Sequence, residues 1–324
     1  MENRRMGGIL CCLVSALLAW GASFVQAQSN YPDRPIEMVI GYAAGGPMDF
    51  VAAAFKEKVS KILGQPVLSV FKPGAGGAIG AAYAARAKPD GYTLYLGSNT
   101  TLVLIPLTKK DSGYSPEELV PVCNLTSSPN LLCVKDDAPY KTLAEFIQAA
   151  KAKKMKYATY GVNSGPHILM EALSKAAGFK AIHIPYAGAG PAYVACLGGH
   201  VDMAISTGTG GMVGPERLRV LAHAGTERFE LMPDIPTLKE LGYPLSLVGN
   251  FYIWAPRQTP KENINKVADA YKKAAEESRD EIKKALTNIE QGLNYMNSEE
   301  LDKAAKAEYR LYKRIVEDLG LMAK

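Results

Sequence analysis

The sequence has little cysteine and histidine, and neither is spaced for a metal site or a disulfide framework. Five cysteines occur in 324 residues, and Cys11 and Cys12 lie in the N-terminal apolar run. Cys123, Cys133 and Cys196 are too few to hold a chain of this length together by disulfides. Cys123 and Cys133 could pair in an oxidising compartment, or each could be a buried free thiol. The four histidines show no short ligand spacing. The sequence therefore predicts a packed core, no metal site and no cofactor.

No large excess of charge of one sign is present either. The formal net charge is +5, and the one dense run of lysines, from Lys151 to Lys156, has no neighbouring aromatic residues inside it. Such a run is typical of the solvated face of a helix rather than of a nucleic-acid-binding patch. We therefore expect no nucleic-acid partner.

Only one long apolar run is present, and it stands at the N-terminus. Two arginines precede the run from Ile9 to Trp20, and a Val-Gln-Ala triplet ending at Ala27 offers a cleavage site. A helix that crosses a membrane needs about twenty apolar residues, and this run is shorter. We predict a signal peptide over residues 1–27, cleaved near Ala27, and export to the periplasm.

Apolar strand-like runs alternate with helical stretches through the rest of the chain. This alternation indicates α/β architecture with largely parallel sheets. Because 48% of the residues are apolar in a chain longer than one core usually spans, two lobes are expected. The tail predicts helices near 262–286 and 298–319. The expected strands are Ile36 to Ile40, Val67 to Phe71, Thr93 to Leu96, Leu119 to Leu125, Leu131 to Val134, Lys156 to Tyr160, Ala181 to Ile184 and Val201 to Ile205.

The same connection follows four of these strands: a glycine-rich loop and then the start of a helix. Three of the loops end in Gly-Pro, and proline is favoured at the first helical position. Loops at the carboxyl ends of parallel strands form the ligand crevice, and a helix N-terminus favours an anion because its first N–H groups lack partners. The first loop is Ala43 to Pro47, the second Pro73 to Gly77, the third Gly161 to Pro166 and the fourth Tyr186 to Pro191.

Cations are scarce around these loops. Lys72 is the one cation within or directly beside them, so a bound anion would be met by N–H groups, hydroxyls and water. A multiply phosphorylated ligand usually recruits more cations. The loops therefore favour a small carboxylate, held by two loops from each lobe.

Two patterns could indicate an enzyme instead. Ser164 and His167 could serve a hydrolase or lyase, but the segment Gly-Val-Asn-Ser-Gly is not the nucleophile elbow. The glycines from Gly74 to Gly80 follow a strand, as in a dinucleotide loop, but their spacing is off by one. No second carboxylate is identifiably paired with Asp49 or Asp202. We predict that the chain is not an enzyme, with a hydrolase or lyase using Ser164 and His167 as the alternative.

Several short motifs occur in a fixed order along the chain. They are Tyr31-Pro32-Asp33-Arg34-Pro35-Ile36, Gly45-Gly46-x-x-Asp49, Pro73-Gly74-Ala75-Gly76-Gly77, Pro89-Asp90-Gly91-Tyr92-Thr93, Pro185-Tyr186-x-Gly188 and Pro233-Asp234-Ile235-Pro236-Thr237. With these motifs the sequence resembles the extracytoplasmic solute receptors of the tripartite tricarboxylate transporter family, also called Bug receptors. The resemblance runs from about Tyr31 to the C-terminus. The sequence departs from the family at Ala53, where an arginine is common, and at Phe71-Lys72, where an Asn-Arg pair is common.

The resemblance implies a two-lobed type II periplasmic-binding-protein fold with a hinged cleft between the lobes. We place lobe I at residues 28–128 and 250–324, and lobe II at 129–249. The resemblance further implies that a di- or tricarboxylate, acidic amino acid or aromatic carboxylate is captured in the closing cleft. A monomeric receptor would then deliver this ligand to the large and small integral membrane subunits of a secondary transporter. A ligand-sensing receptor that is not coupled to transport is the alternative.

Ligand contacts are expected on the four loops and on polar residues at strand ends. The side chains of Tyr42, Tyr160, Tyr186 and Phe251 are expected to set the size of the pocket. The expected contacts are Tyr42, Ala43, Gly45, Gly46, Pro47, Asp49, Gly74, Ala75, Gly76, Gly77, Ser98, Asn99, Ser128, Ser164, Gly165, His167, Tyr186, Gly188, Ala189, Gly190 and Thr207.

Overall fold

A computed structural model describes residues 30–323, and the predicted signal peptide with its cleavage site lies outside them. Within the described range no helix is both long and apolar enough to cross a membrane. The strands are β1 Ile36–Ile40, β2 Val67–Phe71, β3 Thr93–Ser98, β4 Leu119–Lys135, β5 Met155–Thr159, β6 Ala181–Pro185, β7 Met203–Thr207, β8 Leu218–His223, β9 Val248–Pro256 and β10 Gly292–Met296.

Helices follow most of the strands, and a long helical tail closes the chain. The stretch predicted as one helix over 262–286 forms two helices. Ser278 is the C-cap of the first and the N-cap of the second. The helices are α2 Pro47–Leu63, α3 Ala78–Ala85, α4 Ile105–Thr108, α5 Leu143–Ala152, α6 Gly165–Ala177, α7 Ala189–Leu197, α8 Lys261–Glu277, α9 Arg279–Thr287 and α10 Ser298–Asp318, with short turns η1 Ala75–Gly77, η2 Thr100–Leu104 and η3 Pro116–Glu118.

The first lobe is built on three parallel strands in the order β2, β1, β3. Ile36 pairs with Val67 on one side of β1, and Glu37 pairs with Thr93 on the other. Helix α3 packs on β1 and β3, while α2 packs against α8 and α9. The predicted strand–loop–helix units therefore form one lobe.

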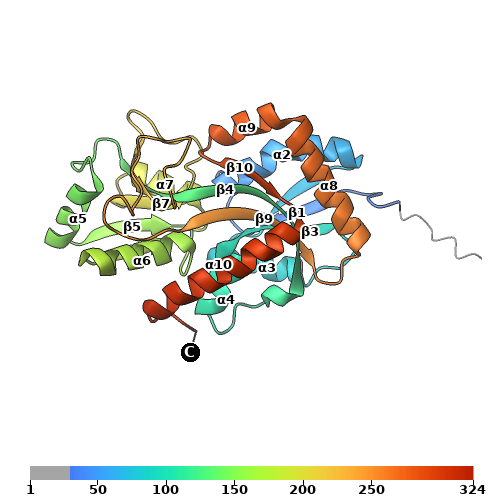
Figure 1. Cartoon of the computed structure of the whole chain (residues 1–324), viewed down its shortest axis with the longest axis horizontal. Coiled ribbons are helices and arrows are strands. Elements are labelled where there is room, and N and C mark those ends of the chain that lie inside the picture. Colours follow the sequence, from blue (N-terminus) through green and yellow to red (C-terminus); the bar gives the residue numbers. More distant parts are fainter. Residues whose placement is uncertain (1–29, 324) are drawn as a thin grey trace, which may run out of the picture. The chain divides into compact units, whose positions relative to one another are not determined.

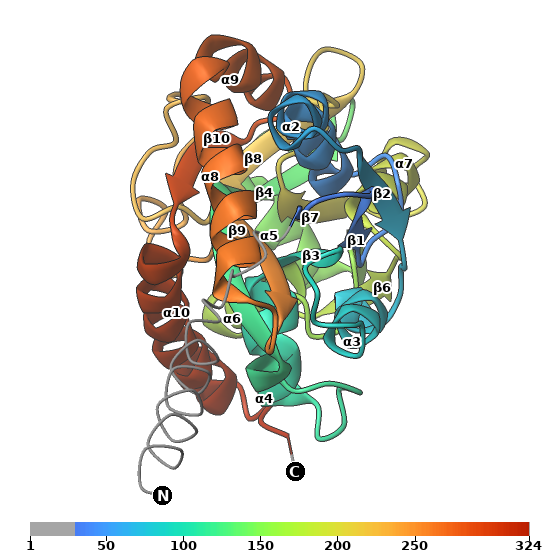
Figure 2. The same cartoon turned by 90° about the vertical axis from the view of Figure 1, so that its right-hand side faces the viewer.

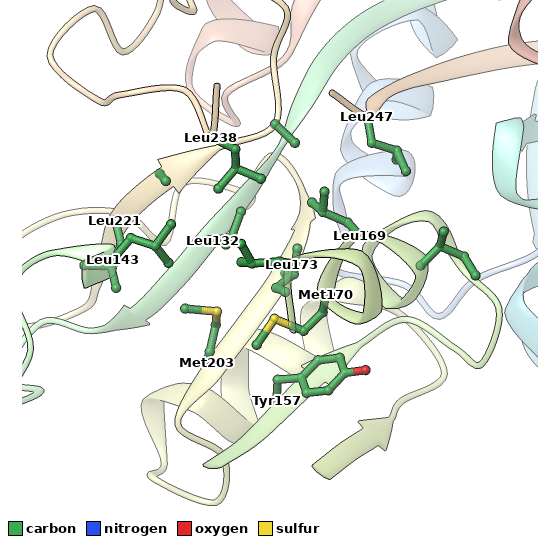
Figure 3. Packing of buried hydrophobic residues seen from close by; sticks show 14 of the residues in the cluster. Leu132, Leu143, Tyr157, Leu169, Met170, Leu173, Met203, Leu221, Leu238 and Leu247 are labelled. Carbon is green, nitrogen blue, oxygen red and sulfur yellow. The ribbon is translucent and has the colours of Figure 1, made fainter. Parts of the chain in front are cut away.

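The second lobe repeats this plan with parallel strands β7, β5 and β6, and β8 pairs antiparallel with β4. Its core lies between α6 and the sheet (Figure 3), where Leu169, Met170 and Leu173 of α6 face Leu132 and Met203. Each such buried side chain stabilises the fold by about 1.5–3 kcal/mol. The helical spacing of these residues explains why α6 lies flat on the sheet.

Strands β4 and β9 run antiparallel from one lobe into the other (Figure 1). Along β4, pairing with β9 ends at Pro129, and pairing with β7 begins at Asn130. The two strands expected at 119–125 and 131–134 are thus one continuous strand. The sheets are parallel only within each lobe, and these crossing strands make the whole sheet mixed.

Helix α10 takes part in the cores of both lobes. It packs beside β4 and η2 along one flank of the sheet (Figure 2). Leu301 near its start belongs to the apolar cluster of Val39 and Tyr95, whereas Tyr312 and Val316 belong to the second-lobe cluster. The tail therefore connects the two lobes in addition to the crossing strands.

All three cysteines in the described range are free and buried. Burial in the apolar interior raises the pKa of the Cys196 thiol to about 12 because the thiolate would lose its hydration. Of the two arrangements left open for Cys123 and Cys133, the structure has the buried free thiols.

A carboxylate ties α10 to the crossing strand β9. Glu308 accepts hydrogen bonds from the amide of Asn250 and the hydroxyl of Tyr252, both of which are buried. One turn later the Tyr312 hydroxyl donates to the Val248 carbonyl at 2.9 Å. Burial raises the pKa of Glu308 from 4.5 to about 7, since the charged form is poorly solvated there.

The Glu308 contact makes a pH-dependent contribution to stability. A raised pKa means that the native state holds the proton more tightly than the unfolded state, so the contribution is full below pH 4.5 and is lost as pH rises through about 7. Relative to a Glu308→Gln variant, the free energy of unfolding of the wild type should fall by about 2 kcal/mol across this window, after allowance for partial exposure. Urea titrations of both proteins at several pH values measure this difference.

The control is Glu317→Gln, which alters an exposed carboxylate on the same helix. This variant controls for the loss of one carboxylate from α10 without the contacts to Asn250 and Tyr252. A pH-independent difference between wild type and Glu308→Gln would show that Glu308 does not titrate in this range.

Candidate functional site

The four glycine-rich loops meet in pairs between the two lobes. The first loop contacts the fourth, and the Ala43 N–H donates to the Ala187 carbonyl at 3.0 Å. The second loop contacts the third, where the backbone of Gly76 lies against Gly161. The carboxyl ends of the parallel strands in one lobe therefore face those of the other, as the expected cleft requires.

Two glycines permit this close approach. A Cβ atom on Gly190 would lie 2.7 Å from the Gly45 carbonyl oxygen, and one on Gly161 would lie 2.8 Å from the Gly76 Cα. Real Cβ atoms do not approach so closely, so a side chain at either position would force the lobes apart. Gly161 also has a φ of +146°, which side chains disfavour. These two glycines therefore allow the backbones of the two lobes to come into contact.

Thr100 joins the lobes through its hydroxyl. It opens the π-helical turn η2, and one residue separates it from the end of β3. Its Oγ1 accepts the Gly165 N–H at 3.0 Å and lies 3.2 Å from the Tyr160 hydroxyl. Gly165 is the first residue of α6, so the first lobe satisfies an amide that the second lobe's helix leaves without a helical partner.

A small inner cavity lies where the first loop meets the second lobe. Its volume is about 20 Å³, which is about the space that one water molecule needs. The inner cavity is lined by Tyr42, Ala43, Gly46, Pro47, Met48, Ser98, Tyr160, Ala189, Ser206, Thr207 and Phe251.

The polar groups of the inner cavity are neutral hydroxyls and backbone amides. The Tyr42 hydroxyl donates to the Gly76 carbonyl at 2.9 Å and lies 3.3 Å from Ser98 Oγ. Burial keeps the pKa of Tyr42 well above its ordinary value, so the phenol stays protonated and can donate. Helices α2 and α7 begin at the cavity wall, at Pro47 and Ala189. This set of groups suits an anion or a hydrogen-bonding polar group.

A larger outer groove opens beside the inner cavity. Its volume is about 560 Å³, and it receives backbone from the second, third and fourth loops. The outer groove is lined by Gly74, Ala75, Gly76, Ile105, Lys109, Gly161, Val162, Asn163, Pro185, Tyr186 and Ala187.

The other expected contacts line neither space. Several are glycines that shape the loops, and the polar ones have side chains that form hydrogen bonds elsewhere. Asp49 accepts the Gly45 N–H at 2.9 Å, the Asn99 amide donates to the Val248 carbonyl at 2.7 Å, and the Ser128 hydroxyl accepts the Gly292 N–H at 3.0 Å. The expected contacts outside both lining sets are Gly45, Asp49, Gly77, Asn99, Ser128, Ser164, Gly165, His167, Gly188 and Gly190.

Ser164 and His167 do not face each other as a nucleophile and a base. The buried Ser164 hydroxyl donates to the Gly161 carbonyl at 2.7 Å. His167 Nδ1 accepts the Asn163 N–H at 3.1 Å, and its ring stacks on His183 with centroids 4.2 Å apart. Burial lowers the pKa of His167. Within residues 30–323 no hydrogen bond joins the two side chains, so the pairing that a hydrolase needs is missing.

Some lining residues were not singled out from the sequence. Ser206 precedes the expected Thr207, the last residue of β7, so the strand-end rule could have found it. Met48 follows the first loop directly. Nothing in the sequence marks Lys109, because the short helix α4 brings it to the outer groove. Lys72, the cation noted beside the second loop, instead lies 4.7 Å above the ring of Tyr83.

Comparisons with known sequences identify similar proteins over most of the chain. A family model described as "Tripartite tricarboxylate transporter family receptor" matches residues 51–321. The "UPF0065 protein in gbd 5'region" of Cupriavidus necator is 36% identical over 311 residues, which cover 95% of this chain and 94% of that protein.

Solved structures show the same fold. Periplasmic binding protein BugD matches with a TM-score of 0.85 at 27% identity, covering 91% of this chain and 100% of that one. MatC of Rhodopseudomonas palustris, solved with bound malate, matches with a TM-score of 0.82 at 27% identity, covering 88% and 100%. The predicted two-lobed periplasmic-binding-protein fold is confirmed.

The bridge from Thr100 to Gly165 can be tested by hydrogen exchange. Thr100→Val keeps the shape of the side chain but removes the acceptor, and a buried polar group left unpaired costs about 1–3 kcal/mol. We expect the Gly165 amide to exchange roughly tenfold faster in this variant, as measured by NMR. Thr100→Ser retains the hydroxyl and should exchange like wild type. Equal protection in Thr100→Val would contradict the bridge.

Proposed function

The chain belongs to the tripartite tricarboxylate transporter receptor family, and on this basis we propose that it captures a small organic acid between its lobes and delivers it to a secondary transporter. Members of the family and the solved relatives are solute-binding receptors. The chain is accordingly a receptor and not an enzyme. The ligand class that we propose is a di- or tricarboxylate, an acidic amino acid or an aromatic carboxylate.

The observation that carries the proposal is the meeting of glycine-rich loops from both lobes over a cavity whose lining, among the described residues, is mostly apolar, with several hydroxyl-bearing side chains and no charged one. Tyr42, Ser98 and Ser206, which carry hydroxyls, are among the lining residues, and two helices begin beside the cavity. Hydroxyls and helix starts can bind a carboxylate without a buried counter-charge. The malate bound to MatC supports a dicarboxylate ligand for this chain as well.

Ligand entry requires the lobes to separate, because the inner cavity of about 20 Å³ has no room for an organic acid. We propose lobe I at residues 28–128 and 250–324 and lobe II at 129–249. The change of partner along β4 after Pro129 and the start of β9 at Val248 support these boundaries. The crossing strands would then act as the hinge.

We further propose that the receptor works as a monomer in the periplasm, after cleavage of residues 1–27 near Ala27. The description of the matching family supports a tripartite transporter as the partner, with one large and one small integral membrane subunit. The apolar N-terminal run supports export.

A thermal-shift screen tests the ligand class. The mature chain would be heated with mono-, di- and tricarboxylates, acidic amino acids and aromatic acids. At a hundredfold excess over its dissociation constant, a ligand adds about 2.7 kcal/mol to the free energy of unfolding, which raises the midpoint by several degrees. Uncharged amides of the same acids serve as controls, and mass spectrometry of the recovered ligand should show it unchanged.

Two outcomes would count against the proposal. Equal shifts from acids and their uncharged amides would mean that the cleft does not select a carboxylate. The absence of any shift across all the acid classes would remove organic acids as the ligand.

A further inference from the structure

Contacts between the lobes lie between the inner cavity and the outer groove. Gly76 of the first lobe lies against Gly161 of the second. Tyr42 and Tyr160, also from opposite lobes, meet edge to face with ring centroids 5.2 Å apart. When the lobes separate, both contacts are lost, so the two spaces become one continuous cleft. A ligand that enters the open cleft therefore meets both spaces.

Charge is distributed unequally along this cleft. Among the described residues that line the inner cavity or the outer groove, Lys109 is the one charged side chain. The inner cavity offers hydroxyls and amides to one carboxylate. A second carboxylate on the same ligand would find its counter-charge only in the outer groove, at Lys109.

Lys109 is available for such a contact. It caps α4, and its N–H donates to the Ile105 carbonyl at 2.9 Å. Ile105 lines the same groove, so the local backbone places Lys109 at the groove wall. The side chain is exposed, and within residues 30–323 no ion pair joins it to a carboxylate. Asp111, the nearest acidic residue in the sequence, accepts the Gly113 N–H at 2.9 Å.

We infer that the outer groove is a second subsite of the cleft, in which Lys109 pairs with the distal carboxylate of an extended dicarboxylate. This inference rests on the proposed function and narrows its ligand class. The proximal carboxylate occupies the inner end of the opened cleft, and the apolar chain of the ligand passes between Gly76 and Gly161. Lys109 then discriminates a dicarboxylate from a monocarboxylate of the same length.

The test combines variants that change the charge at position 109 with dicarboxylates and their matched monoamides. Calorimetry would compare succinate, glutarate, adipate and suberate with their monoamides, which keep the length but lose the distal charge. An exposed lysine–carboxylate contact contributes up to about 1 kcal/mol, so Lys109→Gln should weaken binding of the favoured dicarboxylate about three- to fivefold. Lys109→Glu should weaken it about tenfold or more by repulsion. Neither variant should alter binding of the corresponding monoamide.

Lys110→Gln is the matched control. Lys110 is the next residue and is also exposed, but it lines neither space. Equal melting temperatures of the free variants would confirm that all of them are folded. The preference of the wild type for the dicarboxylate should also diminish as ionic strength rises, since salt screens an exposed pair.

The outcomes separate this inference from the proposed function. If the wild type binds a dicarboxylate and Lys109→Gln affects it no more than Lys110→Gln, the subsite is refuted and the carboxylate receptor stands. An equal loss for the dicarboxylate and its monoamide also refutes the charge pairing. If the wild type binds none of the four dicarboxylates, the inference fails, and the thermal-shift screen alone decides whether another organic acid is the ligand.

Discussion

Contact of backbone with backbone across the cleft is the constraint on which the rest of the site depends. At the points where opposite loops meet, Gly190 lies on Gly45 and Gly161 lies on Gly76. Such contacts leave no side chain to adjust, so the chain itself fixes how closely the lobes approach. Around them, Thr100 adds a hydrogen bond between the lobes. The inner cavity is what remains once these contacts have formed, and its size follows from them.

The segments that connect the lobes must change conformation for the contact between opposite loops to form and break. Strands β4 and β9 cross from lobe to lobe, and α10 contributes Leu301 to one core and Tyr312 to the other. The proposed opening would therefore bend two strands and also move a helix packed on both lobes. The polar contacts of Glu308 with Asn250 and Tyr252 hold that helix to β9 close to the point of crossing.

Local patterns in the sequence predicted much of the fold. They missed the features that depend on contacts between residues distant in the sequence. Strands β1 to β7 and the helix start at Pro47 follow from alternation and from a Gly-Pro pair, which act within a few residues. Strands β8, β9 and β10 were not among the expected strands, and α7 begins at Ala189, two residues before its proline. Roles set by distant partners did not follow. Asn99 was expected in the cleft but bonds to the Val248 carbonyl, and Lys109 has no local motif. The glycine pattern located the loops that lie between the lobes, but it could not reveal that these loops contact each other.

The account can be tested most directly by measuring the distance between the lobes in solution. Spin labels on cysteines replacing the exposed Lys61 and Lys180 would report it by double electron–electron resonance, since Cys123, Cys133 and Cys196 are buried. We predict a longer, broader distance distribution in the free protein and a shorter, narrower one when a carboxylate identified by the thermal screen is bound. The same distribution with and without saturating carboxylate would contradict a cleft that closes on its ligand.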